Sequence, residues 1–443
     1  MDIEVKNFGT IQDAHVHIGG LTVITGENDT GKSTVGKILF SIVKAIARYE
    51  FDLEEDKDDR LLSIAEVLYF SIIRRSINVS THTKIRDLFH PKKLVSQIKM
   101  DTNTTLAECY NTLSQMLDNN ELTNLSFSGA STELEKMRSI IEEPDDKVYA
   151  MNRAISKAFF SEFRGEIVPK GQFEALKPSV IVNDGASPLM KINWVSDTKF
   201  KFEFDDELGY SDATYVESPA IMQFHNLVQM SKTLFEFKGD AAGRATVPLH
   251  IKDLSNKLSD SIYNLYAYND LFHEPEEDIH SQVSARISRA FNGEISYDSE
   301  KFDFLLNREG YVISSSNIAS GVKSLGILDM IIKGGHAEDN NLLILDEPEV
   351  NLHPKWQVLY CELICELVRS GVDIIITTHS PYIIDSLKHF ADKLSIENSF
   401  YLAMRLPNEA LTTFLDITDN VSYAIDLLAE PLHDLNKDDF DDF

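Results

Sequence analysis

The chain contains little cysteine. Its three cysteines, Cys109, Cys361 and Cys365, are too few for a disulfide framework and fit a reducing compartment. Cys361 and Cys365 stand four positions apart on a predicted helix, so they share one face of it. No matching Cys/His pair accompanies them, and we therefore expect buried thiols rather than half of a zinc site.

Basic residues are also scarce, because 42 lysines and arginines stand against 71 aspartates and glutamates. The formal net charge of -29 repels the phosphate backbone of nucleic acids at long range. Bulk charge therefore does not indicate a nucleic-acid-binding protein, although a local basic patch could still bind one.

Long apolar runs are missing as well. None reaches the roughly 18 residues that a membrane-spanning helix needs. The first residues, 1–7, are charged and strand-like, which does not suit a secretory signal peptide. We therefore expect a cytoplasmic protein without a membrane segment. Its 443 residues, 43% of them hydrophobic, are enough for a main domain with a large insertion or a second domain.

A glycine-rich segment near the N-terminus has the pattern G-x-x-x-x-G-K-[ST]. It follows a predicted buried strand, 21–25, and precedes a predicted helix, 33–49. Glycines allow the backbone N–H groups to curl around phosphate oxygens, and the helix N-terminus adds positive potential. The predicted nucleotide-binding residues are Gly26, Glu27, Asn28, Asp29, Thr30, Gly31, Lys32, Ser33 and Thr34. Lys32 is expected to bridge the β- and γ-phosphates of ATP, and Ser33 to ligate Mg²⁺.

A second apolar run, 342–345, ends in the carboxylates of Asp346 and Glu347. Ligands of open α/β sheets bind at the carboxyl ends of the strands. Asp346 is therefore predicted to serve the Mg²⁺ shell, and Glu347 to act as general base toward the attacking water. His379, after the predicted strand 372–376, is placed to reach a γ-phosphate or that water.

The region between these motifs changes character along the chain. The charged segment 51–60 is interpreted as a linker, and helical patterns follow at 61–77, 92–100 and 105–117. We predict an ATPase head in 1–48 and 179–430, a mostly helical insertion in 49–178 and an acidic tail in 431–443. The tail is either a docking segment for a partner or simply a frayed end.

Strand patterns return at 180–182, 192–195, 200–204 and 214–217, and helical patterns at 251–269 and 276–291. A small antiparallel meander is predicted over 295–314. One locally basic stretch within the insertion is either a solvated helix face or a contact site for a partner or nucleic acid. It comprises Arg74, Arg75, Lys84, Arg86, Lys92, Lys93 and Lys99.

Four segments occur in a characteristic order: GENDTGKS (26–33), ASGVKS (319–324), LLILDEPEVNLHP (342–354) and TTHSP (377–381). Together they resemble the ABC-ATPase head family, and especially its branch of SMC, RecF-type and OLD ATPases. The resemblance covers residues 1–48 and 290–390. It implies an α/β fold, in which a P-loop mixed sheet is flanked by helices and accompanied by a small antiparallel part, with a mostly helical insertion.

The resemblance also assigns roles. Ser320 and Gly321 match the signature that contacts the γ-phosphate of ATP held by another subunit. Val322 and Lys323 replace the usual Gly and Gln, and Lys323 could still face the phosphates. Glu347 matches the catalytic glutamate and His379 the switch histidine. The D-loop is matched by Val350, Asn351 and Leu352, and Gln223 is the candidate Q-loop glutamine.

One chain carries one cradle and one signature, so in this family two chains sandwich two ATP molecules. The implied ligands are ATP and Mg²⁺, and the first implied partner is a second copy. The first hypothesis is a sensor or scaffold ATPase of bacterial anti-phage defence that controls a separate effector, a nuclease or toxin encoded nearby. The stretch after His379 is too short for the Toprim nuclease domain of OLD proteins.

The alternative hypothesis is a RecF/SMC-like DNA repair ATPase that binds DNA directly. It would need a basic DNA-facing surface, for which the basic stretch is the candidate. A transporter subunit is disfavoured, because Ser320 follows Lys32 at a far longer interval than in those subunits.

Overall fold

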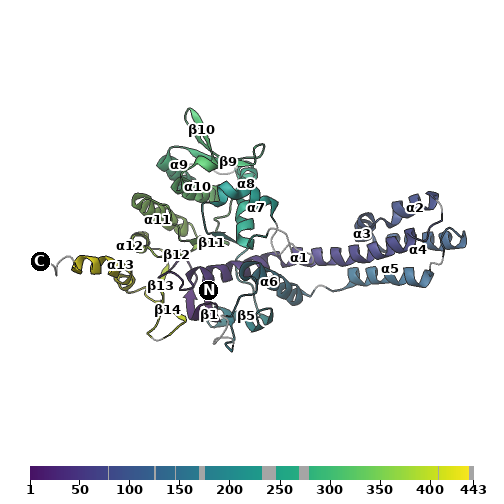
Figure 1. Ribbon diagram of the computed structural model, residues 1–443, viewed down its shortest axis with the longest axis horizontal. Helices are drawn as coiled ribbons and strands as arrows, with labels where there is room; N and C mark the ends of the chain where they lie inside the picture. Colours follow the sequence, from purple (N-terminus) through teal and green to yellow (C-terminus); the bar gives the residue numbers. More distant parts are fainter. Residues whose placement is uncertain are drawn as a thin grey trace. The chain divides into compact units, whose positions relative to one another are not determined.

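The computed structural model describes residues 1–77, 79–123, 126–144, 146–168, 175–231, 246–268, 279–407 and 409–438 (Figure 1). Its internal contacts divide the chain into two units. The first comprises Met1–Ala47 and Asn152–Phe443, and the second comprises Arg48–Met151.

The first unit is built on a mixed sheet of eleven strands among the described residues, in the order β6-β5-β4-β1-β2-β14-β13-β3-β12-β11-β7. From β13 to β7 neighbouring strands run parallel, and from β6 to β2 they run antiparallel. The strands are β1 Asp2–Phe8, β2 Ile11–His17, β3 Leu21–Gly26, β4 Ser179–Asp184, β5 Ser187–Ser196, β6 Lys199–Phe204, β7 Asp212–Val216, β11 Asn341–Asp346, β12 Asp373–Thr378, β13 Asn398–Arg405 and β14 Thr412–Asp416.

Helices accompany this sheet in the first unit. They are the beginning of α1 (Lys32–Ile73), the end of α6 (Lys147–Phe163), α7 Ile221–Met230, α8 Leu249–Tyr268, α9 Ile279–Phe291, α10 Ser320–Lys333, α11 Pro354–Arg369, α12 Pro381–Leu394 and α13 Val421–Asp438. The expected α/β head with flanking helices is thus confirmed.

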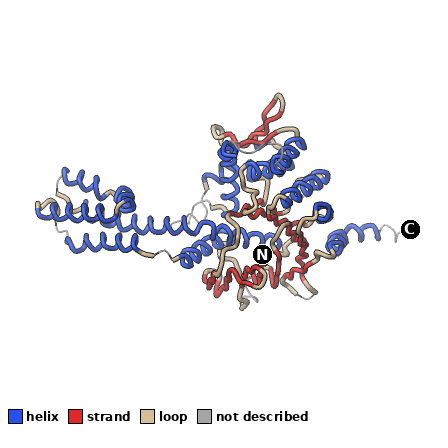
Figure 2. Tube along the Cα trace, turned by 180° about the vertical axis from the view of Figure 1, so that it is seen from behind, coloured by secondary structure: helices blue, strands red, loops and turns tan. Residues whose placement is uncertain are grey.

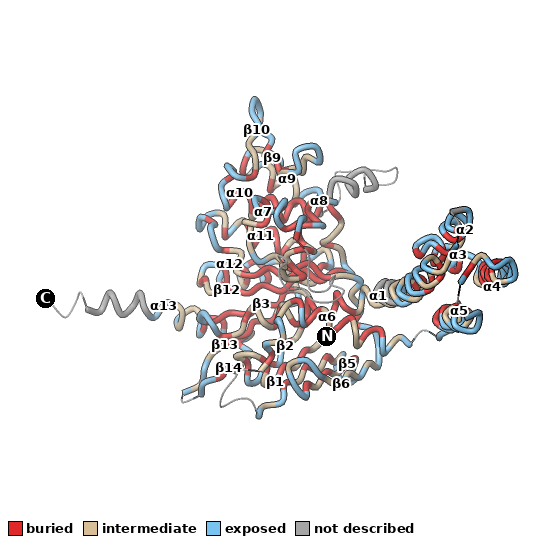
Figure 3. The backbone as a smooth tube through the Cα atoms, turned by 45° about the vertical axis from the view of Figure 1, so that its right-hand side comes forward, coloured by how far each residue is buried: buried red, intermediate tan, exposed pale blue. Residues whose placement is uncertain are grey.

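The central parallel strands are buried on both faces, as their continuous apolar sequences predict. In β11, Leu342 and Ile344 belong to one hydrophobic cluster, while Leu343 and Leu345 belong to another. This alternation follows from the two-residue period of a strand. In Figure 3, β3 and β12 are drawn almost wholly in the colour of buried residues. Hydrophobic clusters on both faces of the sheet therefore hold these strands and their carboxyl ends in place.

A small sheet of three strands, in the order β10-β9-β8, confirms the predicted meander. Its strands are β8 Glu294–Asp298, β9 Asp303–Arg308 and β10 Tyr311–Ser314, and the 3-10 turn η1 Ser315–Asn317 leads from it into α10. Ile295 of β8 packs against α10 so closely that a Cβ added at Gly326 would lie 2.3 Å from its Cδ1. This contact holds α10, the helix that begins with the predicted signature, against the small sheet.

The second unit is helical apart from one isolated bridge, Ser76–Leu122, in its described residues (Figure 2). It contains the rest of α1, α2 Val79–Phe89, α3 Pro91–Met100, α4 Thr102–Asp118, α5 Phe127–Glu142 and the first residues of α6. It has its own apolar core, which includes Leu68, Phe89, Leu113 and Leu134.

Three predicted boundaries differ from the structure. The segment 51–60 is not a linker but the middle of α1, since it has neither glycine nor proline to end a helix. The second unit ends at Met151 and the first unit resumes at Asn152, whereas the predicted insertion extended to residue 178. The predicted tail begins inside α13, which continues to Asp438, and 439–443 lie outside the described residues.

No helix in the described parts of the chain is long and apolar enough to cross a membrane. Cys109, Cys361 and Cys365 are buried and unpaired, as expected. Burial raises the pKa of Cys109 and of Cys365 to about 12, so these thiols stay protonated at neutral pH.

Candidate functional site

The glycine-rich segment forms a loop between β3 and α1. Gly26 has φ +145°, and a Cβ added there would lie 2.2 Å from the carbonyl oxygen of Ala403. Gly31 has φ +82°, and a Cβ there would lie 2.8 Å from Cγ1 of Ile11. Both positions therefore exclude larger residues. The loop leads directly into the N-terminus of α1 at Lys32, which is the geometry that binds phosphates.

Lys32 lies inside this loop with only 4% of its surface exposed. Its ammonium group donates hydrogen bonds to the carbonyl oxygens of Gly26 (3.0 Å) and Glu27 (2.6 Å). Burial lowers the pKa of Lys32, although the charges of Glu347 and Asp346 act in the opposite direction. A buried cation surrounded by backbone dipoles is suited to a polyanion such as a triphosphate.

Ser33 and Asp346, the two predicted Mg²⁺ ligands, meet at the start of α1. The Ser33 hydroxyl donates to Oδ1 of Asp346 at 2.8 Å, and Tyr215 of β7 donates to its Oδ2 at 2.8 Å. Thr377 of β12 also donates to Oδ1. Burial, followed by the charge of Asp346, raises the pKa of Tyr215 well above its ordinary value, so Tyr215 remains a donor.

This hydroxyl and carboxylate fit Mg²⁺, a hard cation that takes oxygen ligands and often keeps several waters beside nucleotide phosphates. The described residues contain no group of three or more His, Cys, Asp or Glu side chains that could hold a metal by themselves. Ser33 and Asp346 would thus hold the ion together with phosphates of the nucleotide.

Glu347 follows Asp346 at the carboxyl end of β11. Its φ of +47° is unusual for a residue other than glycine, and such strained positions cluster at functional sites. Its N–H donates to the carbonyl oxygen of Thr377 at 3.0 Å. Nδ1 of His379 lies 3.4 Å from Oε1 of Glu347 and 3.4 Å from Oε1 of Glu349. The predicted base and the predicted switch histidine are therefore neighbours.

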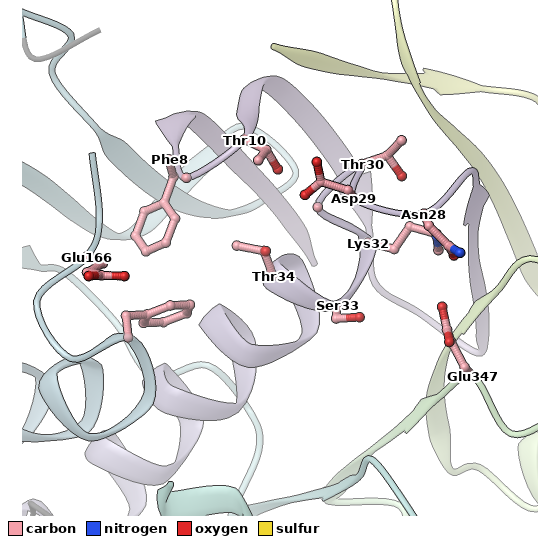
Figure 4. A pocket seen from close by; sticks show the side chains of 13 residues that line it. Phe8, Thr10, Asn28, Asp29, Thr30, Lys32, Ser33, Thr34, Glu166 and Glu347 are labelled. Carbon is pink, nitrogen blue, oxygen red and sulfur yellow. The ribbon is translucent and has the colours of Figure 1, made fainter. Parts of the chain in front are cut away.

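A pocket of about 330 Å³ is lined by Lys32, Ser33 and Glu347 among others, a size that suits a small-molecule ligand. Figure 4 shows Lys32, Asn28 and Glu347 on one side of it. Phe8 and Glu166 lie at the other side, beyond Thr34. Its lining comprises Phe8, Gly9, Thr10, Asn28, Asp29, Thr30, Gly31, Lys32, Ser33, Thr34, Phe163, Glu166 and Glu347. The pocket thus has a part lined by the glycine-rich loop and a part lined by two phenylalanines.

The predicted signature lies at the N-terminus of α10. A Cβ added at Gly321 would lie 3.1 Å from the carbonyl oxygen of Asn351 and 3.2 Å from the ring of Trp356. Signature and predicted D-loop are therefore in contact within one chain. Ser320 is exposed, and neither it nor Gly321 lines the pocket of the same chain.

Lys323 of the predicted signature and Gln223, the candidate Q-loop glutamine, contact each other. Lys323 is 3% exposed, and its ammonium group donates to Oε1 of Gln223 on α7 at 2.8 Å. Burial lowers the pKa of Lys323. Gln223 does not line the pocket. The β7 residue that does reach the predicted metal ligands is Tyr215, because the register of β7 and β11 pairs it with Ile344, two positions before Asp346.

Besides Tyr215, Glu349 is a residue of this site that the sequence analysis did not single out. It is 6% exposed, and its Oε1 accepts hydrogen bonds from the Thr378 hydroxyl (2.6 Å) and the His379 N–H (2.9 Å). It thereby fixes the segment that carries His379, the predicted switch histidine. Its place in the segment 342–354, one of the four segments that resemble the ABC-ATPase head family, was the sequence signal that could have indicated it.

The basic stretch of the insertion is partly neutralised by acidic neighbours. Lys99 lies 2.8 Å from Glu54 and 2.9 Å from Asp58, and Lys84 lies 3.4 Å from Glu121. These pairs reduce the positive potential available to a nucleic acid.

Two family models match the chain. Residues 1–164 match the family described as "AAA ATPase domain". Residues 199–385 match the family described as "AAA domain, putative AbiEii toxin, Type IV TA system". Each model covers less than half of the chain. Together with the P-loop and the strand-end carboxylates, these matches define a protein with an AAA/ABC-type ATPase fold.

Solved structures of SMC heads are similar to the chain at low sequence identity. The SMC head domain from Thermotoga maritima is 8% identical, with a TM-score of 0.39, over 94% of this chain and 97% of that chain. An Smc head domain with an extended coiled coil from Pyrococcus furiosus, bound to the C-terminal domain of ScpA, is 10% identical, with a TM-score of 0.41, over 97% and 98%. No curated protein matches the chain.

Proposed function

We propose that the chain binds and hydrolyses ATP in the pocket between the glycine-rich loop and the carboxyl end of β11. The observation that carries this proposal is the convergence of Lys32, the Ser33–Asp346 pair and Glu347 around one pocket. Phosphoryl transfer to water requires these parts: a cradle for phosphates, oxygen ligands for Mg²⁺ and a base beside the γ-phosphate.

Each residue then has a distinct task. Lys32 and the loop N–H groups hold the phosphates, while Ser33 and Asp346 hold Mg²⁺. Bound Mg²⁺ neutralises negative charge on the phosphates. Glu347 accepts the proton of the attacking water, and His379 beside it orients the water or contacts the γ-phosphate.

We further propose that two chains close around two ATP molecules. Ser320 is exposed at the N-terminus of α10, Gly321 beside it is buried, and neither lines the pocket of its own chain. An exposed serine at a helix N-terminus suits contact with ATP held by a second copy. Lys323 supports the signature from within through Gln223 rather than facing the phosphates.

The cycle of closing and opening is proposed to control an effector protein in anti-phage defence, in a cytoplasmic, OLD-like system. Support comes from the description of the matched family, which names a toxin system. The DNA repair alternative has less support, because acidic neighbours pair with Lys84 and Lys99 of the basic stretch.

The ATPase proposal is tested by substituting Lys32. Lys32→Ala is expected to lose binding of a fluorescent ATP analogue, because the buried cation that pairs with the phosphates is gone. Lys6→Ala, which removes an exposed lysine of β1, is the matched control and should bind normally. Normal binding by Lys32→Ala would refute the cradle assignment.

The role of Glu347 and of the defence cycle are tested separately. Glu347→Gln should bind ATP but release no phosphate.

In cells that carry the chain with its neighbouring genes, plaque counts after phage challenge should be reduced by the wild type and not by Lys32→Ala. Equal plaque counts, combined with sensitivity of a deletion strain to DNA damage, would favour the repair alternative.

A further inference from the structure

Arg405 is the last residue of β13, the strand that pairs in parallel with β3 on the side away from β12. In this register Ala403 pairs with Gly26, where the glycine-rich loop begins. Two residues farther, the guanidinium group of Arg405 reaches over the loop. Its Nη2 donates to the carbonyl oxygen of Asp29 at 2.7 Å and to Oδ2 of the same residue at 2.8 Å.

Asp29 brings a left-handed backbone and a negative charge to the phosphate cradle. Its φ of +62° is left-handed, a conformation that costs energy for residues other than glycine. Its carboxylate is 78% exposed, and the residue lines the pocket beside Lys32. A carboxylate at the edge of a triphosphate site repels the ligand, because like charges at short range disfavour binding.

Arg405 counteracts both disadvantages. Its positive charge neutralises the carboxylate, and its two hydrogen bonds hold the backbone carbonyl and the side chain of Asp29 together. Because Arg405 is the last residue of β13, its main chain is fixed by the sheet. Neither matched family model reaches this residue, since they cover 1–164 and 199–385.

We propose that Arg405 is a positioning residue of the nucleotide site, which acts through Asp29 by holding the glycine-rich loop in its phosphate-binding conformation and cancelling the charge at its edge. This inference rests on the proposed ATP binding. It assigns part of the nucleotide affinity to the β13 end, outside the P-loop, the signature and the strand-end carboxylates.

The test is a double-mutant cycle on the full chain, with the dissociation constant of a fluorescent ATP analogue and the ATP turnover number measured for each variant. Arg405→Ala should weaken binding about five- to tenfold, which corresponds to about 1–1.4 kcal/mol, with turnover at saturation nearly unchanged. Asp29→Gly removes the carboxylate and relieves the left-handed backbone, so it supplies the second background of the cycle.

The decisive variant combines both changes. In the Asp29→Gly background, Arg405→Ala should have a clearly smaller effect, because the charge and strain that Arg405 counteracts are absent and only its hydrogen bond to the carbonyl oxygen of residue 29 remains. Arg405→Lys should restore part of the affinity, since it keeps the charge without the guanidinium fork. High salt should reduce the difference between wild type and Arg405→Ala, because the pair is exposed.

Arg369→Ala on α11 is the matched control for loss of an exposed arginine. Unchanged affinity of Arg405→Ala in an ATP-binding wild type would overturn this inference while leaving the proposed function intact. An equal loss in both backgrounds would also overturn it, by assigning Arg405 to the nucleotide itself. Failure of the wild type to bind ATP would instead refute the proposed function.

Discussion

Glu349 lies behind the pocket, where its buried Oε1 accepts hydrogen bonds from Thr378 and from the backbone of His379. The same oxygen lies 3.4 Å from Nδ1 of His379. Hydrogen bonds to an ionised carboxylate are stronger than those between neutral groups. Glu349 therefore holds the histidine beside Glu347 without touching the pocket itself.

We expect Glu349→Gln to lower the ATP turnover number about tenfold while changing ATP affinity by less than about threefold, because the phosphate cradle is untouched. Steady-state phosphate release and titration with an ATP analogue separate the two quantities. Glu409→Gln, at an exposed loop position, is the control. Full turnover by Glu349→Gln would show that the histidine is held by other contacts.

Among single residues, Lys32, Ser33 and Asp346 could be picked out from the sequence, because each belongs to a short segment whose residue types and spacing are typical of phosphate and Mg²⁺ binding. Tyr215 could not be predicted, since a tyrosine among apolar strand residues is normally core. Only the pairing of β7 with β11 brings its hydroxyl to Asp346. The contact of Lys323 with Gln223 likewise joins segments far apart in the sequence.

Among the secondary-structure elements, α1, β7 and α8 are joined by a buried ion cluster. Lys44 of α1 lies 2.5 Å from Asp212 of β7 and 2.7 Å from Asp253 of α8. Lys257 of α8 lies 2.7 Å from the other oxygen of Asp212. Since α1 begins at the phosphate cradle, this cluster fixes the helix that presents Lys32 and Ser33.

Acid should weaken this connection. Burial alone would raise the pKa of Asp212, but the charges of Lys257 and Lys44 outweigh it and lower the pKa to about 2. A lowered pKa contributes stability above the unfolded value of about 3.9 and loses it as pH falls toward the folded value. Wild type should thus be more stable than Asp212→Asn near neutral pH, and this difference should shrink between about pH 4 and pH 2.

Urea unfolding of both proteins at several pH values measures this difference. Asp206→Asn, at an exposed loop position, is the control and should follow the wild type. A difference that stays constant down to pH 2 would contradict the assignment of the charge to Asp212.

The elements themselves were largely predictable. The strands after residue 179 and the meander at 295–314 showed regular alternation, and the structure contains both. The segment 51–60 was misjudged because charge was taken as a sign of a linker. An exposed helix also tolerates charge, and α1 continues through the segment.

At the scale of the whole molecule, the proposed functional unit is larger than one chain. The cradle and the signature are both in the first unit, yet Ser320 and Gly321 do not line the pocket of their own chain. We propose that each pocket is completed by the signature of a second copy. A shared site of this kind could be predicted from the sequence, because one chain carries one cradle and one signature.

The most direct test mixes two inactive variants. Lys32→Ala lacks a working cradle, and Ser320→Arg lacks a working signature, so neither should hydrolyse ATP alone. A co-expressed mixed dimer contains one complete site, formed by the cradle of the Ser320→Arg chain and the signature of the Lys32→Ala chain. With random pairing and independent sites, turnover should return to about a quarter of wild type. An inactive mixture of folded, paired chains, or full turnover by Ser320→Arg alone, would contradict a site shared between two copies.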